Sequence, residues 1–229
     1  MPILAIDTTT AVCSAALADE GQLLAEVTTN IPRTHSQRLM PLVDSLFQET
    51  GLTPQDLDLL AVTRGPGSFT GLRIGIATIK GLGLALDIPV VGASSLQVLA
   101  HNFGGEAYVC PVLNARRDQV YTALFETGGK LPQTLIAEQA MAIPDLLIEL
   151  EQYHRPIWFC GDGVDLVLPG AQRITAHRAP LHLESSRAAA LADMARHLAP
   201  MPVDQLTPLY LRESQAEVQL RQKQAGQNG

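Results

Sequence analysis

The sequence is poor in lysine and aromatic residues, and it has no long hydrophobic run. Only three of its 229 residues are lysine, and the net charge is −7. Such a surface does not attract nucleic acid by itself, so contact with RNA would need a basic partner or a local arginine patch. No stretch of eighteen apolar residues occurs, and no basic segment opens the chain. We therefore expect a cytoplasmic protein without a signal peptide or membrane span.

Cysteines and metal-ligand patterns are equally sparse. Cys13, Cys110 and Cys160 are far apart in apolar, strand-like runs, which indicates buried free thiols in a reducing compartment. The six histidines include no pair spaced three or four residues apart on a predicted helix, and none stands beside an acidic cluster. His35 precedes a predicted helix and could cap it or contact another segment, although a surface position is favoured. We therefore predict no metal site.

The apolar pattern of the first half predicts three strands followed by alternating helices and strands. This order does not fit a doubly wound parallel sheet, and it favours an α/β domain with a mixed sheet that opens with an antiparallel hairpin. The predicted strands are 3–6, 12–18, 22–28, 59–63 and 88–91, and the predicted helices are 36–50, capped by Ser36, 72–86, and one capped by Ser94 or Ser95 that ends near 103.

The second half starts a second, smaller α/β unit. Its predicted strands are 108–113, 120–126 and 157–160, and its helices are 144–153 and 185–198, with Ser185 as the cap of the last. The predicted domains are 1–104 and 105–197, with a return over about 198–214 that packs near the first domain. The glutamine-rich segment 215–229 is predicted to be a disordered tail.

A glycine-rich run from Arg64 to Gly75 lies between a predicted strand and a predicted helix. A strand, a glycine turn and a helix start can hold a phosphate through backbone N–H groups, here at Gly65, Gly67 and Ser68. The common nucleotide fingerprints fail, because Thr70 stands where a glycine is needed. The alternative is that the glycines permit close packing of backbone or of a neighbouring helix.

The turn after the first strand offers a second candidate phosphate loop at Asp7, Thr8 and Thr9. Actin-like phosphotransferases place an aspartate and a phosphate-binding turn at this point. They use glycine in the turn, whereas threonines stand here, which weakens the catalytic interpretation. The other interpretation is a plain Asx turn.

Four segments together resemble the TsaB (YeaZ) family: Ile3 to Thr8, the run Arg64 to Gly75, Ala115-Arg116 with Val120-Tyr121, and Pro208 to Arg212. The resemblance spans residues 2–212. It implies an actin-like (ASKHA, ribonuclease-H-like) α/β fold of two domains with mixed sheets, the second domain reduced.

The resemblance also implies a role without catalysis. Such proteins bind TsaD, which forms N6-threonylcarbamoyladenosine at position 37 of tRNAs reading ANN codons, and the ATPase TsaE joins them. TsaD-like proteins carry two metal-binding histidines at the positions that match Ser95 and Leu99, which cannot hold a metal. The chain itself would need no cofactor, ATP would belong to the complex, and tRNA would be an indirect partner.

The resemblance implies that helices 36–50 and 72–86 form a four-helix bundle with TsaD, or with a second copy in a homodimer. Gly71, Gly75 and Thr78 form a small-residue stripe that would let a partner helix approach closely. Leu39, Leu42, Val43 and Leu46 are expected to divide between core and interface. The predicted interface is Leu39, Leu42, Val43, Leu46, Gly71, Gly75, Thr78 and Leu82.

Two other interpretations remain open. The chain could be an enzyme acting alone, either an actin-like ATP-binding protein or a metal-independent relative of peptidases. It could also be a dimerisation module unrelated to RNA. Arg116 and Arg117 lie at a predicted hairpin tip, where a solvated turn is the default and contact with RNA or an acidic partner is the less favoured alternative.

Overall fold

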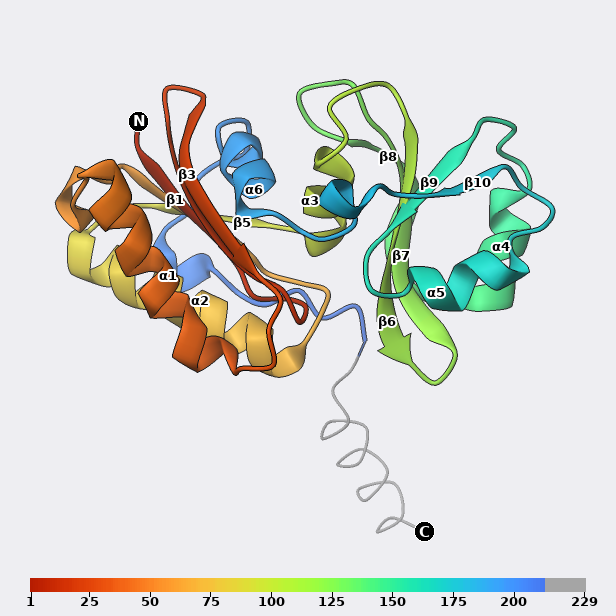
Figure 1. Ribbon diagram of the computed structural model, residues 1–229, viewed down its shortest axis with the longest axis horizontal. Coiled ribbons are helices and arrows are strands. Elements are labelled where there is room, and N and C mark those ends of the chain that lie inside the picture. The colour runs from red at the N-terminus through yellow and green to blue at the C-terminus, as the bar shows by residue number, and fades with distance from the viewer. Residues whose placement is uncertain (213–229) are drawn as a thin grey trace, which may run out of the picture.

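The computed structural model describes residues 1–212, which form two five-stranded sheets with helices packed on them (Figure 1). The first sheet has the strand order β3-β2-β1-β4-β5. β1 pairs antiparallel with β2 and parallel with β4, and β2–β3 and β4–β5 continue these two directions. Its strands are β1 (Ile3–Asp7), β2 (Cys13–Asp19), β3 (Gln22–Thr29), β4 (Leu59–Thr63) and β5 (Val90–Ala93).

Helices cover both faces of the first sheet. α1 (His35–Thr50) and α2 (Phe69–Leu86) share one core with one face of the sheet, and they lie beside each other in Figure 1. α6 (Ala188–Ala195) packs on the opposite face. α3 (Ser95–His101) lies between the two sheets, because Val98 packs with the first core while Leu96 and Leu99 pack with the second sheet.

The second sheet repeats the mixed arrangement, with the order β10-β9-β6-β7-β8. β6 pairs antiparallel with β7 and parallel with β9, so a hairpin again lies beside parallel strands. The strands are β6 (Tyr108–Arg116), β7 (Gln119–Glu126), β8 (Gln133–Ala142), β9 (Ile157–Cys160) and β10 (Ala176–Arg178); the helices are α4 (Ile143–Leu150) and α5 (Val164–Val167). Short 3-10 turns occupy Pro54–Asp56, Leu168–Gly170, Leu181–Leu183 and Val203–Gln205.

The predicted fold class, a two-unit α/β protein with mixed sheets, is confirmed, but several element boundaries differ. β8 was missed, because it is an edge strand in which only Ile136 is buried and the alternation of apolar residues is weak. α2 begins at Phe69 rather than Leu72, since the Ser68 hydroxyl accepts the Gly71 N–H and caps it. α1 begins at His35 behind Thr34, so Ser36 lies inside the helix and is not its cap.

The segment after α6 returns to the first sheet. Met201 forms a two-way backbone bridge with Val90 at the edge of β5, and Leu206 is fully buried in the core beneath α2. The predicted return over 198–214 is described as far as residue 212. The predicted tail, 215–229, lies outside the described residues.

α2 has the length and mean hydropathy of a membrane span, with about a third of it buried. Its inward side packs on the first sheet through Gly71, Ile76 and Ile79. The apolar character of α2 therefore serves two surfaces, one in the core of the domain and one facing outward. Contacts with its own domain therefore cover only the inward side of α2.

Candidate functional site at the turn after the first strand

Asp7 ends β1 in a closed polar network. The carboxylate is 2% exposed. Its Oδ1 accepts hydrogen bonds from the Thr9 N–H at 2.8 Å and the Thr9 hydroxyl at 2.7 Å, which is an Asx turn. Its Oδ2 accepts a hydrogen bond from the Ser186 hydroxyl. Three donors of the chain itself therefore satisfy the buried charge of Asp7.

The glycine-rich run packs directly on this turn. Thr8 donates its hydroxyl to the Gly71 carbonyl at 2.8 Å, and the Thr9 carbonyl accepts the Ser68 N–H at 2.7 Å. A Cβ atom on Gly67 would collide with the Thr9 carbonyl oxygen, and one on Gly71 would collide with that of Thr8. Glycine is needed at both positions because backbone approaches backbone.

Gly65 holds the first turn of the run against a distant segment. Its φ is +116°, and a Cβ atom there would lie 2.5 Å from the Leu209 carbonyl oxygen. The Leu209 N–H donates to the Arg64 carbonyl at 2.7 Å, and the Ser95 N–H donates to the Gly65 carbonyl at 2.9 Å. The peptide bond between Gly65 and Pro66 is cis.

The two candidate phosphate loops therefore lie against each other. Asp7, Thr8 and Thr9 face Gly67, Ser68 and Gly71. The Thr9 and Ser68 N–H groups, however, already donate to acceptors of the chain. This geometry favours close packing over a phosphate cradle.

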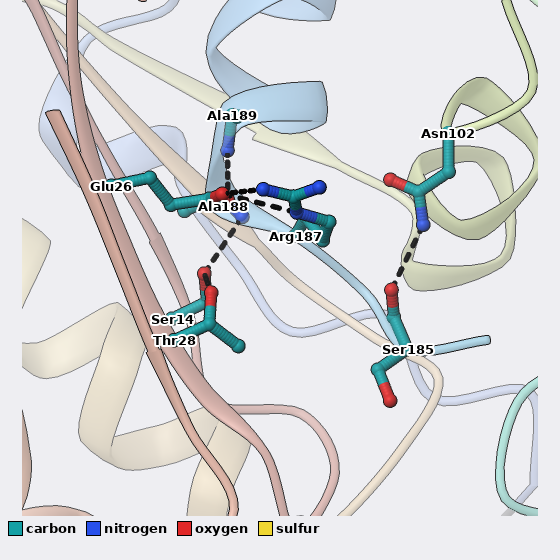
Figure 2. Close-up of polar contacts among 8 residues, drawn as sticks. All are labelled: Ser14, Glu26, Thr28, Asn102, Ser185, Arg187, Ala188 and Ala189. Carbon is teal, nitrogen blue, oxygen red and sulfur yellow. Dashed lines mark hydrogen bonds and ion pairs between the residues drawn. The ribbon is translucent and has the colours of Figure 1, made fainter. Parts of the chain in front are cut away.

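No local pattern in the sequence marks Ser186, which is predicted to lie inside a helix that begins at Ser185. α6 instead begins at Ala188. The polar residues 185–187 before it belong to the segment that connects the second sheet to α6. The Ser185 carbonyl accepts the Asn102 side-chain amide at 2.9 Å (Figure 2). Predicted as a cap, Ser185 is thus an anchor to the end of α3.

The hairpin of the first sheet holds the start of α6 (Figure 2). Glu26, whose side chain is nearly buried, accepts the Ala189 N–H at 3.0 Å and pairs with the Arg187 guanidinium. Ser14 accepts the Ala188 N–H at 3.0 Å and bonds to Thr28 at 2.7 Å. A carboxylate at a helix N-terminus is favourable, and these contacts fix Ser186 beside Asp7.

His35, predicted to lie at the surface, is instead half-buried against the same turn. Its Nε2 bonds to the Thr10 carbonyl at 2.8 Å, and its Nδ1 lies 3.2 Å from Arg38. Burial lowers the pKa of the imidazole, outweighing the Thr10 carbonyl, which raises it. Arg38 is itself buried and also donates to the Thr29 and Ala11 carbonyls, so the pair ties α1 to the hairpin.

Ser95 and Leu99 stand at the two positions that the resemblance matches to metal-binding histidines. Both side chains are buried on α3, and Leu99 packs with Phe103 and Val109. Within residues 1–212, no group of three or more His, Cys, Asp or Glu side chains is placed to hold a metal ion.

Burial raises the pKa of Cys13 to about 11 and that of Cys110 to about 12, so both stay protonated thiols at neutral pH.

The structure corrects much of the predicted interface. Gly71 and Gly75 face inward, and a Cβ atom on Gly75 would lie 2.5 Å from the Thr8 hydroxyl, so these two glycines of the predicted stripe contact the turn after β1. Leu39, Val43 and Leu46 are buried in the core between α1 and the sheet. Leu42, Thr78 and Leu82 are half-buried, and the exposed residues of the two helices include the apolar or small residues Met40, Ala77, Gly81 and Leu84.

Comparison with known proteins places the chain in a family. Residues 22–219 match the family model described as "TsaD: tRNA N6-adenosine threonylcarbamoyltransferase". The chain is 35% identical over 223 residues to the "tRNA threonylcarbamoyladenosine biosynthesis protein TsaB" of Bacillus subtilis, covering 95% of this chain and 96% of that protein. The chain belongs to the TsaB (YeaZ) family. The Escherichia coli TsaB is 40% identical over 129 residues, 55% of each chain.

Solved structures of the TsaB (YeaZ) family share the whole architecture. The structure titled "YeaZ from Pseudomonas aeruginosa" is 30% identical, has a TM-score of 0.80 and covers 92% of this chain and 99% of that chain. A second Pseudomonas aeruginosa structure, titled as an uncharacterized protein with similarity to peptidase YEAZ, is 32% identical with a TM-score of 0.82 and the same coverage. This TsaB-family chain thus shares the fold of these structures, an α/β fold of two units with mixed sheets.

Proposed function

We propose that this chain is a non-catalytic, activating subunit of the complex that forms N6-threonylcarbamoyladenosine at position 37 of tRNAs reading ANN codons. It acts in the cytoplasm by binding TsaD, with TsaE joining the assembly. The main support for a non-catalytic role is the turn after β1. There Asp7 and the N–H groups of Thr9 and Ser68 already form hydrogen bonds with other groups of this chain. A phosphate-transfer enzyme needs such groups directed at its substrate.

The outward face of α1 and α2 is the proposed contact with TsaD. Leu84 is 74% exposed and Met40 is 42% exposed, and the small residues Ala77 and Gly81 of α2 are exposed as well. α2 has an apolar composition that its own domain covers only in part. Apolar surface of this kind marks interaction sites, and small residues on it allow a partner helix to approach closely.

Reconstitution tests the proposal directly. Purified TsaD, TsaE and a threonylcarbamoyl-adenylate-forming enzyme would be combined with ATP and a tRNA transcript, with and without this chain. We expect modified adenosine only when the chain is present. Full activity without the chain would refute the proposed role.

The enzyme alternatives are tested on the isolated chain. Isothermal titration with ATP should give no saturable heat, because the turn at Asp7 is occupied from within. ATP would then bind only within the complex, and the chain would need no cofactor of its own.

The same face of α1 and α2 would hold two copies together as a homodimer in the absence of TsaD, which light scattering measures.

A further inference from the structure

Four arginines at one end of the molecule are outside the ion pairs of the structure. Within residues 1–212, ion pairs engage the arginines at 155, 173, 178, 187 and 196. Arg73, Arg116, Arg117 and Arg212 are in none of these pairs, and neither are Arg33, Arg38 and Arg64, although the chain as a whole carries a net charge of −7. Unpaired guanidinium groups on an acidic protein define a local site of opposite sign.

An exposed aromatic stack stands beside Arg73. The rings of Phe69 and Tyr210 are stacked, with centroids 5.6 Å apart and an interplanar angle of 30°. They are 44% and 43% exposed. The Arg73 Cζ lies 3.8 Å from the centre of the Phe69 ring, and its Nε donates to the Tyr210 hydroxyl at 3.4 Å. Each member of the stack therefore holds the others in place while leaving ring surface in solvent.

The same segment reaches the hairpin of the second sheet. Arg212, two residues after Tyr210, donates to the Ala115 carbonyl at 3.3 Å, next to Arg116. In Figure 1 the end of the blue C-terminal segment lies between the start of α2 and the turn that joins β6 to β7. The start of α2, residues 209–212 and the β6–β7 turn thus form one surface, called here the arginine–aromatic surface.

The β6–β7 turn presents its charges on an unusual backbone. Arg116, Arg117 and Asp118 have φ values of +64°, +54° and +58°, a left-handed conformation that usually selects glycine or asparagine. Such conformations in larger side chains are costly and concentrate at functional sites. Asp118 offsets one of the two charges of the turn. Among the described residues, Asp162 also lies beside this strand end: its carboxylate accepts the Asn114 N–H, and burial raises its pKa.

We infer that the arginine–aromatic surface binds RNA, with phosphates on Arg116, Arg117 and Arg212 and an unpaired base on the Phe69–Tyr210 stack. A partner protein with an acidic surface would need only the guanidinium groups. Exposed aromatic rings beside guanidinium groups match both the base and the phosphate of a nucleotide. The inference rests on the proposed function, which supplies tRNA as the RNA in question. It makes the chain a direct tRNA contact rather than an indirect one.

Fluorescence anisotropy with a labelled transcript of a tRNA that reads an ANN codon tests the inference on the isolated full chain. We expect saturable binding that weakens between about 50 and 200 mM salt. Replacing both Arg116 and Arg117 by Ala should reduce the slope of log affinity against log salt by about two, roughly one for each phosphate contact. Tyr210→Ala should weaken binding roughly 5- to 100-fold through lost stacking.

Arg173→Ala is the matched control, because Arg173 is 80% exposed on the second domain and pairs with Glu151, which is not part of this surface. Its affinity should stay within about twofold of the parent. No saturable binding, or the same loss in the control, would overturn the inference. Co-elution with TsaD separates the two proposals: if the Arg116 and Arg117 variant keeps its RNA affinity but loses TsaD, the surface is a protein interface, and the proposed function stands.

Discussion

The Ser186 hydroxyl donates a hydrogen bond to the Asp7 carboxylate across 179 positions of sequence. The two residues come from the segment that returns from the second sheet and from the first strand of the first sheet. The contact lies at the turn after β1, which the sequence offers as a candidate phosphate loop. It therefore joins the two halves of the chain at the point where a ligand would otherwise be expected.

Ser186→Ala should destabilise the protein by about 1.5–3 kcal/mol, because it removes a donor from a buried carboxylate. Urea unfolding followed by circular dichroism measures the change. Ser36→Ala is the control, since Ser36 is exposed and bonds only to the exposed Thr34 hydroxyl. The control should stay within about 0.5 kcal/mol of the parent. Equal effects of the two substitutions would contradict a special role for the Asp7 contact.

Gly71→Ala and Gly81→Ala should have opposite effects on the free energy of unfolding, although both lie in α2. The new Cβ atom at position 71 meets the Thr8 carbonyl oxygen, so we expect a loss of about 1–3 kcal/mol. At position 81 nothing lies within 4 Å, and the better helix propensity of alanine should add about 0.5–1 kcal/mol. A neutral Gly71→Ala would show that the contact with Thr8 relaxes freely.

Leu84→Asp should weaken pairing with TsaD at least roughly tenfold, because it places a charge within the proposed apolar contact. Ile148→Asp is the matched control: Ile148 is 66% exposed on α4, against 74% for Leu84 on α2. Pull-down and light scattering measure the pairing, and thermal unfolding checks that both variants remain folded. Equal loss from both substitutions, or none from Leu84→Asp, would exclude this face as the contact.

Stability should fall as the pH drops below about 6.5, and His35 should account for part of the fall. Burial lowers the pKa of His35 in the folded state, so the unfolded chain binds the proton more readily and acid favours unfolding. In the neutral form the ring donates to the Thr10 carbonyl and accepts from Arg38, whereas a second ring proton would face the Arg38 guanidinium.

His35→Gln should therefore flatten the dependence of the melting temperature on pH between about 7.5 and 5. Glutamine can still donate to the Thr10 carbonyl, so the contact with the turn is kept in part. His154→Gln serves as the control because His154 is exposed in the second unit. A profile of the His35 variant parallel to that of the parent would contradict the assignment.

The sequence by itself determined the fold class, the strands at the centre of both sheets and the family. These depend on local signals: β4 was predicted at its observed bounds because a short apolar run is bounded by polar and glycine-rich segments. The family depends on motifs such as the run from Arg64 to Gly75, which survive in the sequence whatever they contact. An edge strand such as β8 has little burial and so leaves little pattern.

Only the tertiary structure decided what those motifs touch. Gly71 and Gly75 gave the same small-residue stripe whether they met a partner helix or the Thr8 turn, because helical spacing fixes a face but not what packs against it. The partner of Asp7 was hidden for the same reason. Ser186 is brought to it by the hairpin contacts at Ser14 and Glu26, and contacts between such distant positions leave no local pattern to read.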